Sequence, residues 1–133
     1  RDSSTLGIVY DHPMDSCNMD EVDNVFAVNT LSQFSVIQSF LPDLMDQKVS
    51  NIVNMSSLIA LIPASRLSPY SASKAAVKAM SDCLRIELKS TNRDYIHVTT
   101  ILPQFIGTGM FCGALSHKYQ SGGELMVVVS DTP

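Results

Sequence analysis

Three consecutive stretches decide the fold: VSNIVNM at 49–55, YSASKAAVKAMSDCLRIELKS at 70–90 and IHVTTIL at 96–102. The first and third are short and rich in apolar and β-branched residues, which is typical of strands. The middle stretch repeats apolar residues at helical spacing, from Val77 to Leu84 and beyond. Strands that alternate with a helix of this length predict parallel strands joined by crossover helices, and therefore an α/β fold.

The flanking sequence extends this alternation in both directions. Residues 20–41 carry apolar side chains near a 3.6-residue spacing, which predicts a second long helix with one further turn after Pro42. Prolines in 61–69 predict a loop before the helix at 70–90. The apolar run 125–129 is a further candidate strand. We expect an α/β layer fold with parallel strands.

Composition limits what this chain can be. It has 133 residues, enough for one domain, of which 45% are hydrophobic and 17% charged, as in globular proteins. The net charge of −4 gives no electrostatic support for nucleic-acid binding. No apolar run is long enough to span a membrane. Three widely spaced cysteines without a CxxC pair favour a reduced compartment, and the three histidines lack a partner at metal-ligand spacing, so we expect no metal site.

A group of glycines at 107–113 resembles a phosphate-binding loop. The order G-T-G-M-F-C-G does not match G-x-G-x-x-G, because the third glycine comes one residue late. No convincing helix opens after it, as such a loop requires. A plain loop is the simpler interpretation, in which Met110, Phe111 and Leu115 either line an apolar substrate pocket or only pack the loop.

Tyr70 and Lys74 are the residues that best suggest chemistry. They stand at i and i+4, so they share one face of the expected helix. Alone, Y-x-x-x-K is more often a solvated helix edge. Here Ser57 follows the strand before the helix, and Asn29 lies in the preceding helix. We therefore expect these four side chains to meet at one edge of the sheet.

The group has a coherent acid–base chemistry. A tyrosine hydroxyl has an ordinary pKa near 10, and an ammonium group one turn away is expected to lower that pKa. A serine hydroxyl can hold a carbonyl or alcohol oxygen while the tyrosine exchanges a proton with it. The accompanying hydride requires a nicotinamide, because no side chain stores one.

This arrangement resembles the short-chain dehydrogenase/reductase family, whose catalytic tetrad is an Asn, a Ser and a Tyr-x-x-x-Lys in this chain order. The resemblance assigns Tyr70 as acid and base and Ser57 as substrate-oxygen ligand. It assigns Lys74 to the nicotinamide ribose, and Asn29 to a proton-relay water beside Lys74. Of the family, the retinol dehydrogenases and 17β-hydroxysteroid dehydrogenases look most similar. The implied function is NAD- or NADP-dependent interconversion of an apolar alcohol with its ketone or aldehyde.

The family's P-G-x-I-x-T segment, which binds the cofactor, resembles 103–108. By this resemblance Pro103, Ile106 and Thr108 bind the cofactor together with the tyrosine and lysine, although Gln104 stands where the family usually has glycine. The family's opening T-G-x-x-x-G-x-G turn is absent, and of its N-N-A-G motif only Gly7 agrees. By this resemblance we expect a Rossmann-like, doubly wound parallel sheet of three αβα layers, present only as its second half, so that 1–133 is a partial domain without the N-terminal, nucleotide-binding half.

Two functional hypotheses remain. In the first, the chain belongs to an active NAD(P)-dependent oxidoreductase, located on the cytoplasmic side and, in the full-length parent, at the endoplasmic reticulum or a lipid droplet. In the second, it is an inactive truncated or splice form that acts only through dimer helices. Both predict a homodimer formed by the helices at 20–41 and 70–90, where a face of small residues permits close approach. That face comprises Ala72, Ala75, Ala76 and Ala79.

Overall fold

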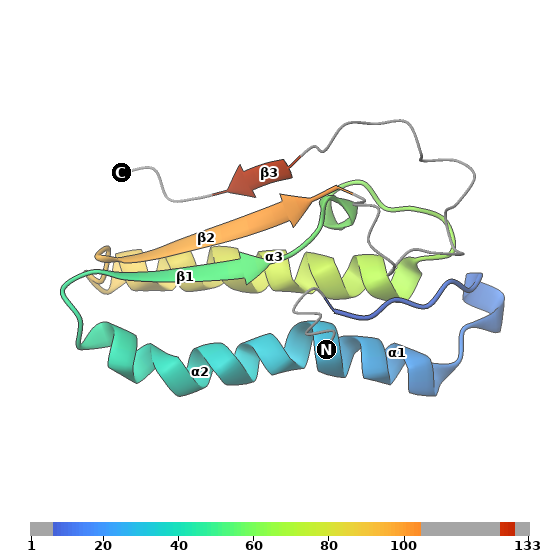
Figure 1. Cartoon of the computed structure of the whole chain (residues 1–133), viewed down its shortest axis with the longest axis horizontal. Helices are drawn as coiled ribbons and strands as arrows, with labels where there is room; N and C mark the ends of the chain where they lie inside the picture. Colours follow the sequence, from blue (N-terminus) through green and yellow to red (C-terminus); the bar gives the residue numbers. More distant parts are fainter. Residues whose placement is uncertain (1–6, 105–125, 130–133) are drawn as a thin grey trace, which may run out of the picture.

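The structure of the chain is a computed structural model, and it describes residues 7–104 and the strand 126–129. Two long helical segments alternate with strands along the chain (Figure 1). The elements in chain order are η1 (Met14–Ser16), α1 (Met19–Phe26), η2 (Ala27–Leu31), α2 (Ser32–Met45), β1 (Ser50–Met55), η3 (Leu58–Ala60), α3 (Ser68–Ser90), β2 (Ile96–Pro103) and β3 (Met126–Val129).

The sheet has the order β1-β2-β3. β1 and β2 are parallel, with Ser50 opposite Ile96 and Met55 opposite Ile101, as the alternation of strand and helix predicts. β3 runs antiparallel to β2, with Met126 opposite Pro103. The expectation of an entirely parallel sheet is therefore wrong for β3. Antiparallel pairing requires only that the chain reverse direction, whereas parallel pairing requires a crossover.

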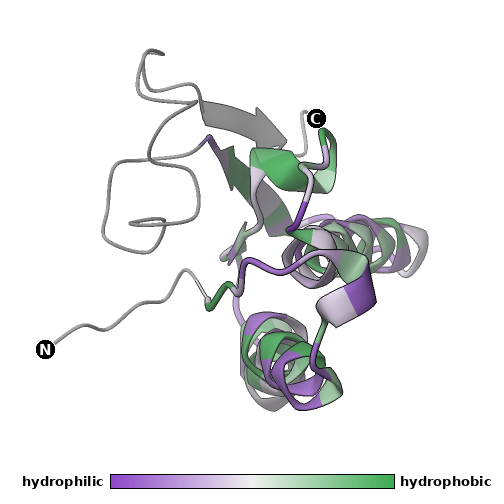
Figure 2. Cartoon of the chain, turned by 90° about the vertical axis from the view of Figure 1, so that its right-hand side faces the viewer, coloured by the Kyte–Doolittle hydropathy of each residue, from purple (hydrophilic) through white to green (hydrophobic). Residues whose placement is uncertain are grey.

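Both long helices lie on the same face of the sheet. Figure 2, which views the helices end-on, shows them side by side with the strands to one side of both. One apolar cluster joins the three elements, since Ile52 of β1 packs with Leu84 of α3 and Ile37 of α2. The α/β class is confirmed, but residues 7–104 form two of the three expected layers. No α-helix in this range covers the other face, where Val53 is exposed.

The first helical segment is continuous from Met19 to Met45, as expected for a helix at 20–41 with one further turn after Pro42. Its middle part, η2, is a π-helical turn that the apolar spacing did not indicate. The helix continues through Pro42 and ends where the Tyr95 hydroxyl donates a hydrogen bond of 3.0 Å to the Met45 carbonyl. A contact from a residue 50 positions away thus stabilises the end of the turn that follows Pro42.

The second helix, α3, begins at Ser68, two residues before the expected start, with Pro69 in its first turn. Its inward face closes the main core of the described chain. The buried members of that core are Ile52, Leu84, Leu88, Ile96 and Val98. The helix therefore holds both parallel strands, and it presents its N-terminal turn at the edge where those strands end.

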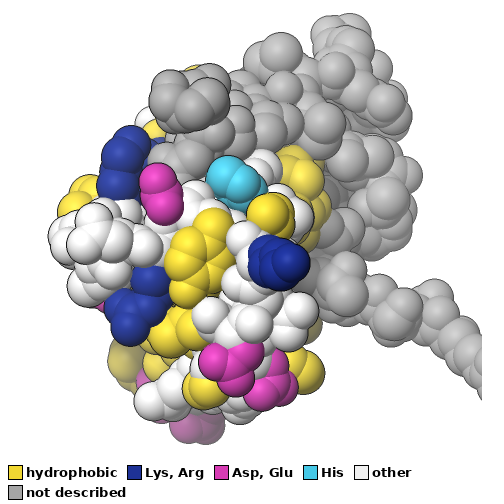
Figure 3. Space-filling model, turned by 90° about the vertical axis from the view of Figure 1, so that its left-hand side faces the viewer, with side chains coloured by type: hydrophobic (Ala, Val, Ile, Leu, Met, Phe, Trp, Pro, Cys, Tyr) yellow, Lys and Arg dark blue, Asp and Glu magenta, His cyan; other side chains and the backbone are white. Residues whose placement is uncertain are grey.

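The opposite end of the molecule has no single sign of charge. Figure 3 shows acidic and basic side chains intermixed with hydrophobic ones over the described part of that face. Within residues 7–104 and 126–129, no helix has the length and apolar character needed to cross a bilayer. The residues that the sequence singled out lie at the other end, beside η3 and the start of α3.

The packing of α3 predicts a large difference between two of its aliphatic residues. Leu84→Ala should lower the free energy of unfolding by about 2–5 kcal/mol, because Leu84 is 8% exposed and its truncation leaves a cavity in the core. Ile86→Ala is the matched control, since Ile86 is 62% exposed on the same helix. Urea unfolding of both variants measures the difference. Equal losses would contradict the orientation of α3.

Candidate active site

The candidate site lies at the carboxyl ends of the two parallel strands. Ser57 follows β1, Pro103 ends β2, and Tyr70 stands in the first turn of α3. Open α/β sheets bind ligands at this edge, because the loops that leave the strands there converge. The strand–loop–helix order of the sequence is thus sufficient to bring residues 13 and 33 positions apart together.

Ser57 and Tyr70 form the centre of the site. Their side chains are hydrogen-bonded to each other. Ser57 Oγ also donates a hydrogen bond of 3.4 Å to the Pro103 carbonyl and accepts one of 3.4 Å from the Ile59 amide. The serine hydroxyl is therefore held in place by the start of η3 and the end of β2. The structure brings together the serine and the tyrosine that the sequence singled out.

Lys74 lies one helical turn below Tyr70 and is 1% exposed. Its Nζ donates a hydrogen bond of 3.2 Å to the Met55 carbonyl and lies 5.8 Å from the centre of the Tyr70 ring. Burial lowers the pKa of Lys74 to about 8, so the ammonium form still predominates at neutral pH. The site therefore places a buried positive charge against the face of its tyrosine.

The effect of this environment on Tyr70 differs from the sequence-based expectation. The pKa of the Tyr70 phenol is raised above its ordinary value, because burial disfavours the charged phenolate. The hydrogen bond with Ser57 acts in the opposite direction without overcoming burial. The expectation that Lys74 would lower this pKa overall is wrong for the chain as it stands. Tyr70 is a protonated phenol at neutral pH, set to donate a proton.

Asn29 is 1% exposed and connects the chain before α1 to α3. Its Oδ1 accepts a hydrogen bond of 2.7 Å from the Ile8 amide, and its Nδ2 donates to the Ile8 carbonyl at 2.9 Å and to Ser73 Oγ at 3.1 Å. Ser73 Oγ in turn donates to the Tyr70 carbonyl at 2.8 Å. Asn29 is thus linked to the Tyr70 turn through Ser73.

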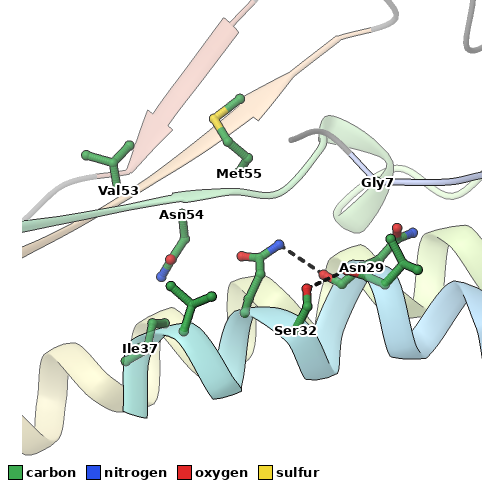
Figure 4. A pocket seen from close by; sticks show the side chains of 10 residues that line it. Gly7, Asn29, Ser32, Ile37, Val53, Asn54 and Met55 are labelled. Atoms are coloured by element: carbon green, nitrogen blue, oxygen red, sulfur yellow. Dashed lines mark hydrogen bonds between the residues drawn. The ribbon is translucent and has the colours of Figure 1, made fainter. Parts of the chain in front are cut away.

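Gly7 explains why the chain can approach Asn29 so closely. Its φ is +104°, and a Cβ atom built there would lie 2.2 Å from Asn29 Oδ1. Gly7 and Asn29 border a cavity of about 340 Å³ between α2 and the end of β1 (Figure 4). Figure 4 shows Asn54 and Met55 of β1 across this cavity from Ser32 and Ile37 of α2.

Several polar residues that the sequence analysis passed over fasten α3 to its neighbours. Ser56 Oγ donates to the Lys74 carbonyl at 2.8 Å, and Thr30 Oγ1 donates to the Ser73 carbonyl at 3.1 Å. Asn54 Nδ2 donates to Ser81 Oγ at 2.8 Å. The sequence could have indicated these residues by their position, because a polar side chain on the inward face of a strand or helix needs a hydrogen-bond partner when it is buried.

Two expected cofactor residues, Ile106 and Thr108, lie outside the described residues, as do the glycine group at 107–113 and Leu115. Pro103 is described and contacts Ser57 through its carbonyl. Within 7–104 and 126–129, no group of His, Cys, Asp or Glu side chains is arranged to hold a metal ion. The described site therefore consists of hydroxyl, amide and ammonium groups.

Comparison with known proteins places the whole of this arrangement in one family. A family model described as short chain dehydrogenase matches residues 5–118. The chain is 37% identical over 98 residues to short-chain dehydrogenase/reductase family 16C member 6 of Bos taurus, a match that covers 74% of this chain and 31% of that protein. It is 30% identical over 115 residues to retinol dehydrogenase 10 of Homo sapiens, covering 86% of this chain and 34% of the relative.

Solved structures give the same result. A short chain dehydrogenase from Burkholderia cenocepacia, in complex with NADP, superposes with a TM-score of 0.71 at 25% identity and covers 80% of this chain and 44% of its own. A second structure, from Burkholderia phymatum in complex with NAD, has a TM-score of 0.73 at 24% identity and supports the fold. The chain spans about a third of the length of the protein relatives it matches.

The contacts of Asn29 predict that its amide nitrogen is required. Asn29→Asp should lower the free energy of unfolding by about 3 kcal/mol at neutral pH, because a buried carboxylate would face the Ile8 carbonyl where Nδ2 now donates. Asn24→Asp is the matched control, since Asn24 is exposed and its Nδ2 donates only to the Tyr10 hydroxyl. Chemical denaturation measures both. Equal stability of the two variants would contradict the bridging role of Asn29.

Proposed function

The chain belongs to the short-chain dehydrogenase family, and on that premise we propose that it carries the catalytic half of an NAD(P)-dependent oxidoreductase that interconverts an apolar alcohol and its carbonyl compound. The observation that supports this most directly is the buried Ser57–Tyr70–Lys74 group at the ends of two parallel strands. A solvated helix edge would not bury the lysine or hydrogen-bond the tyrosine to a serine from another element.

In the proposed reduction, Tyr70 donates its phenolic proton to the carbonyl oxygen while a hydride reaches the carbonyl carbon. Ser57 holds that oxygen by a hydrogen bond, in a position fixed by the Ile59 amide and the Pro103 carbonyl. In the reverse direction the carbinol C–H bond breaks, the hydride leaves, and the phenolate of Tyr70 takes the hydroxyl proton. The raised pKa of Tyr70 keeps the phenol protonated at neutral pH, which is the form that the reduction requires.

The described residues fit the nicotinamide end of the cofactor. When bound, a nicotinamide dinucleotide supplies or accepts the hydride that no side chain can carry. Lys74 would hold the adjoining ribose, since its ammonium group lies in the buried part of the site, beside the Tyr70 ring. Pro103 lies beside Ser57, and Ile106 and Thr108, which follow it in the sequence, are proposed to contribute to cofactor binding.

The proposed substrate is an apolar alcohol such as a retinoid, a steroid or a similar lipid. Tyr70 packs with the buried side chains of Ile59 and Leu67, and Val9 and Ala64 are packed against them. Apolar walls around one polar reacting oxygen are typical of sites for such compounds. The similarity to retinol dehydrogenase 10 supports the same class.

The proposal predicts distinct effects for Tyr70 and Lys74 in the complete enzyme that contains this chain. Tyr70→Phe should reduce turnover of an apolar alcohol by about a hundredfold or more, because the acid–base group is lost while the ring keeps its packing. Cofactor affinity should change little. Lys74→Ala should weaken both turnover and cofactor binding. Nicotinamide absorbance measures turnover, and fluorescence titration measures cofactor binding.

A matched control for Tyr70 is Tyr95→Phe, because the Tyr95 hydroxyl is also hydrogen-bonded but donates to the Met45 carbonyl, at the end of the strands away from the site. This control should retain turnover. Undiminished turnover in Tyr70→Phe would exclude the proposed role of Tyr70. An unaltered enzyme that binds cofactor but turns over no alcohol or carbonyl compound would favour the inactive form instead.

We further propose that the protein forms a homodimer through α2 and α3. An apolar groove with a cavity of about 620 Å³ runs between these helices, lined by Phe34 and Leu41 on one side and Ala76, Ala79 and Cys83 on the other. Phe34 is 49% exposed there. Small residues along one wall let a second helix pair approach closely, and the exposed phenylalanine supplies apolar area to bury.

The groove makes a prediction about association. Ala79→Arg should raise the dimer dissociation constant by about tenfold or more, because a long charged side chain would stand where the second copy packs. Val49→Arg is the control, since Val49 is equally open to solvent but lies outside the groove. Sedimentation velocity at micromolar concentration measures both. A monomeric unaltered protein would contradict the dimer.

A further inference from the structure

Arg66 has a backbone conformation that its residue type rarely adopts. Its φ is +68°, in the left-handed region, and it stands four residues before Tyr70 in the loop from η3 to α3. The other described non-glycine residue in that region is Asn92, just after α3, and asparagine tolerates such a conformation well. An arginine does not, so this position costs free energy that other contacts must offset.

The contacts that hold Arg66 all come from one segment near the start of the chain. Nε donates a hydrogen bond of 2.7 Å to Asp11 Oδ1, and a terminal nitrogen lies 3.4 Å from the Asp11 carbonyl. The His12 amide donates to the Arg66 carbonyl at 3.1 Å. Side chain and backbone of Arg66 therefore both bind a segment 55 positions away. We call this set of contacts the Arg66–Asp11 clasp.

The segment that the clasp holds is one wall of the candidate site. At its beginning, Ile8 is bound through its amide and carbonyl by Asn29. Val9 then packs against the cluster that contains Tyr70 and Ile59. The far end of the segment is held where Asp11 and His12 contact Arg66, where the His12 ring lies 3.2 Å from Glu21, and where the Tyr10 hydroxyl accepts a hydrogen bond from the exposed Asn24.

From this geometry we propose that Arg66 and Asp11 are positioning residues, whose clasp sets the segment 8–12 against Tyr70 and thereby fixes the substrate-facing wall of the site. Neither residue touches the reacting atoms. The inference rests on the function proposed above. Ser57 and Tyr70 are held to each other by β1, β2 and α3, so loss of the clasp should disturb the fit of the alcohol and leave the proton-transfer pair in place.

Opposite effects on two measurements separate positioning from a merely structural role. Arg66→Gly removes the ion pair and also relieves the left-handed strain, because glycine adopts this conformation freely. Its unfolding midpoint in urea should therefore stay level or rise. Its KM for the alcohol should rise about fivefold, the upper limit for an exposed ion pair such as this one. In a structural role, stability and KM would worsen together.

The experiment uses steady-state kinetics of the complete enzyme that contains this chain. Asp11→Asn should raise the KM for the alcohol as Arg66→Gly does, with kcat within about twofold and cofactor affinity unchanged. The reversed pair, Asp11→Arg with Arg66→Asp, should recover most of the KM, since aspartate is well tolerated at a left-handed position. Arg85→Ala is the matched control, because Arg85 pairs with Asp82 at 3.2 Å on another face of α3, and it should leave KM unchanged.

Hydrogen exchange gives a readout that does not depend on turnover. In Arg66→Gly, exchange at the Val9 and His12 amides should become faster, while exchange at Ile52 in the core stays the same. The positioning role would be overturned if KM stayed unchanged in both single variants, or if kcat fell by as large a factor as KM rose. Absence of turnover by the unaltered enzyme would overturn the proposed function before any clasp variant is made, so the two failures are distinguishable.

Discussion

A buried ammonium group is the constraint on which the rest of this site depends. Lys74 is 1% exposed, and a charge removed from water is costly unless polar partners receive it. The Met55 carbonyl at the end of β1 and the face of the Tyr70 ring provide part of that compensation. Both are available because α3 crosses directly behind the ends of the strands. The buried charge of Lys74 thus depends on the position of α3, which brings the lysine to both of these partners.

Polar side chains, rather than apolar packing alone, fix α3 at its N-terminal end. Ser56, just after β1, and Thr30, in η2, donate to consecutive carbonyls of the helix, those of Lys74 and Ser73. Hydrogen bonds restrict rotation and sliding more strictly than aliphatic contacts do, because they are directional. The apolar cluster around Leu84 stabilises the fold further along, where small displacements of the helix would not disturb the site.

The sequence predicted those features that have a local pattern. Strand and helix periodicities placed β1, β2 and α3 to within two residues, and chain order placed Ser57 beside Tyr70. Features that depend on tertiary contacts were missed. The direction of β3, the sign of the change in the pKa of Tyr70 and the contact of Arg66 with Asp11 all arise between segments far apart in the chain. No window of neighbouring residues contains the information that decides them.

The π-helical turn η2 has a consequence for how this helix can vary in length. In a regular α-helix, Ile37 would be rotated by about 120° from Val25, since each residue turns by about 100°. Yet Val25 is fully buried and Ile37 packs on the sheet core. Each residue of the wider π-helical turn rotates by less than about 100°, and this removes much of the difference. The turn therefore lets the buried faces of α1 and α2 both point inward. Removing one residue from Ala27–Leu31 would restore regular winding and keep the apolar stripe of α2 toward the sheet, because eleven regular steps of about 100° would leave Ile37 only about 20° from Val25. The segment η2 is therefore the place in this helix where the loss of one residue should be tolerated best, since a regular α-helical turn would leave the same faces directed inward.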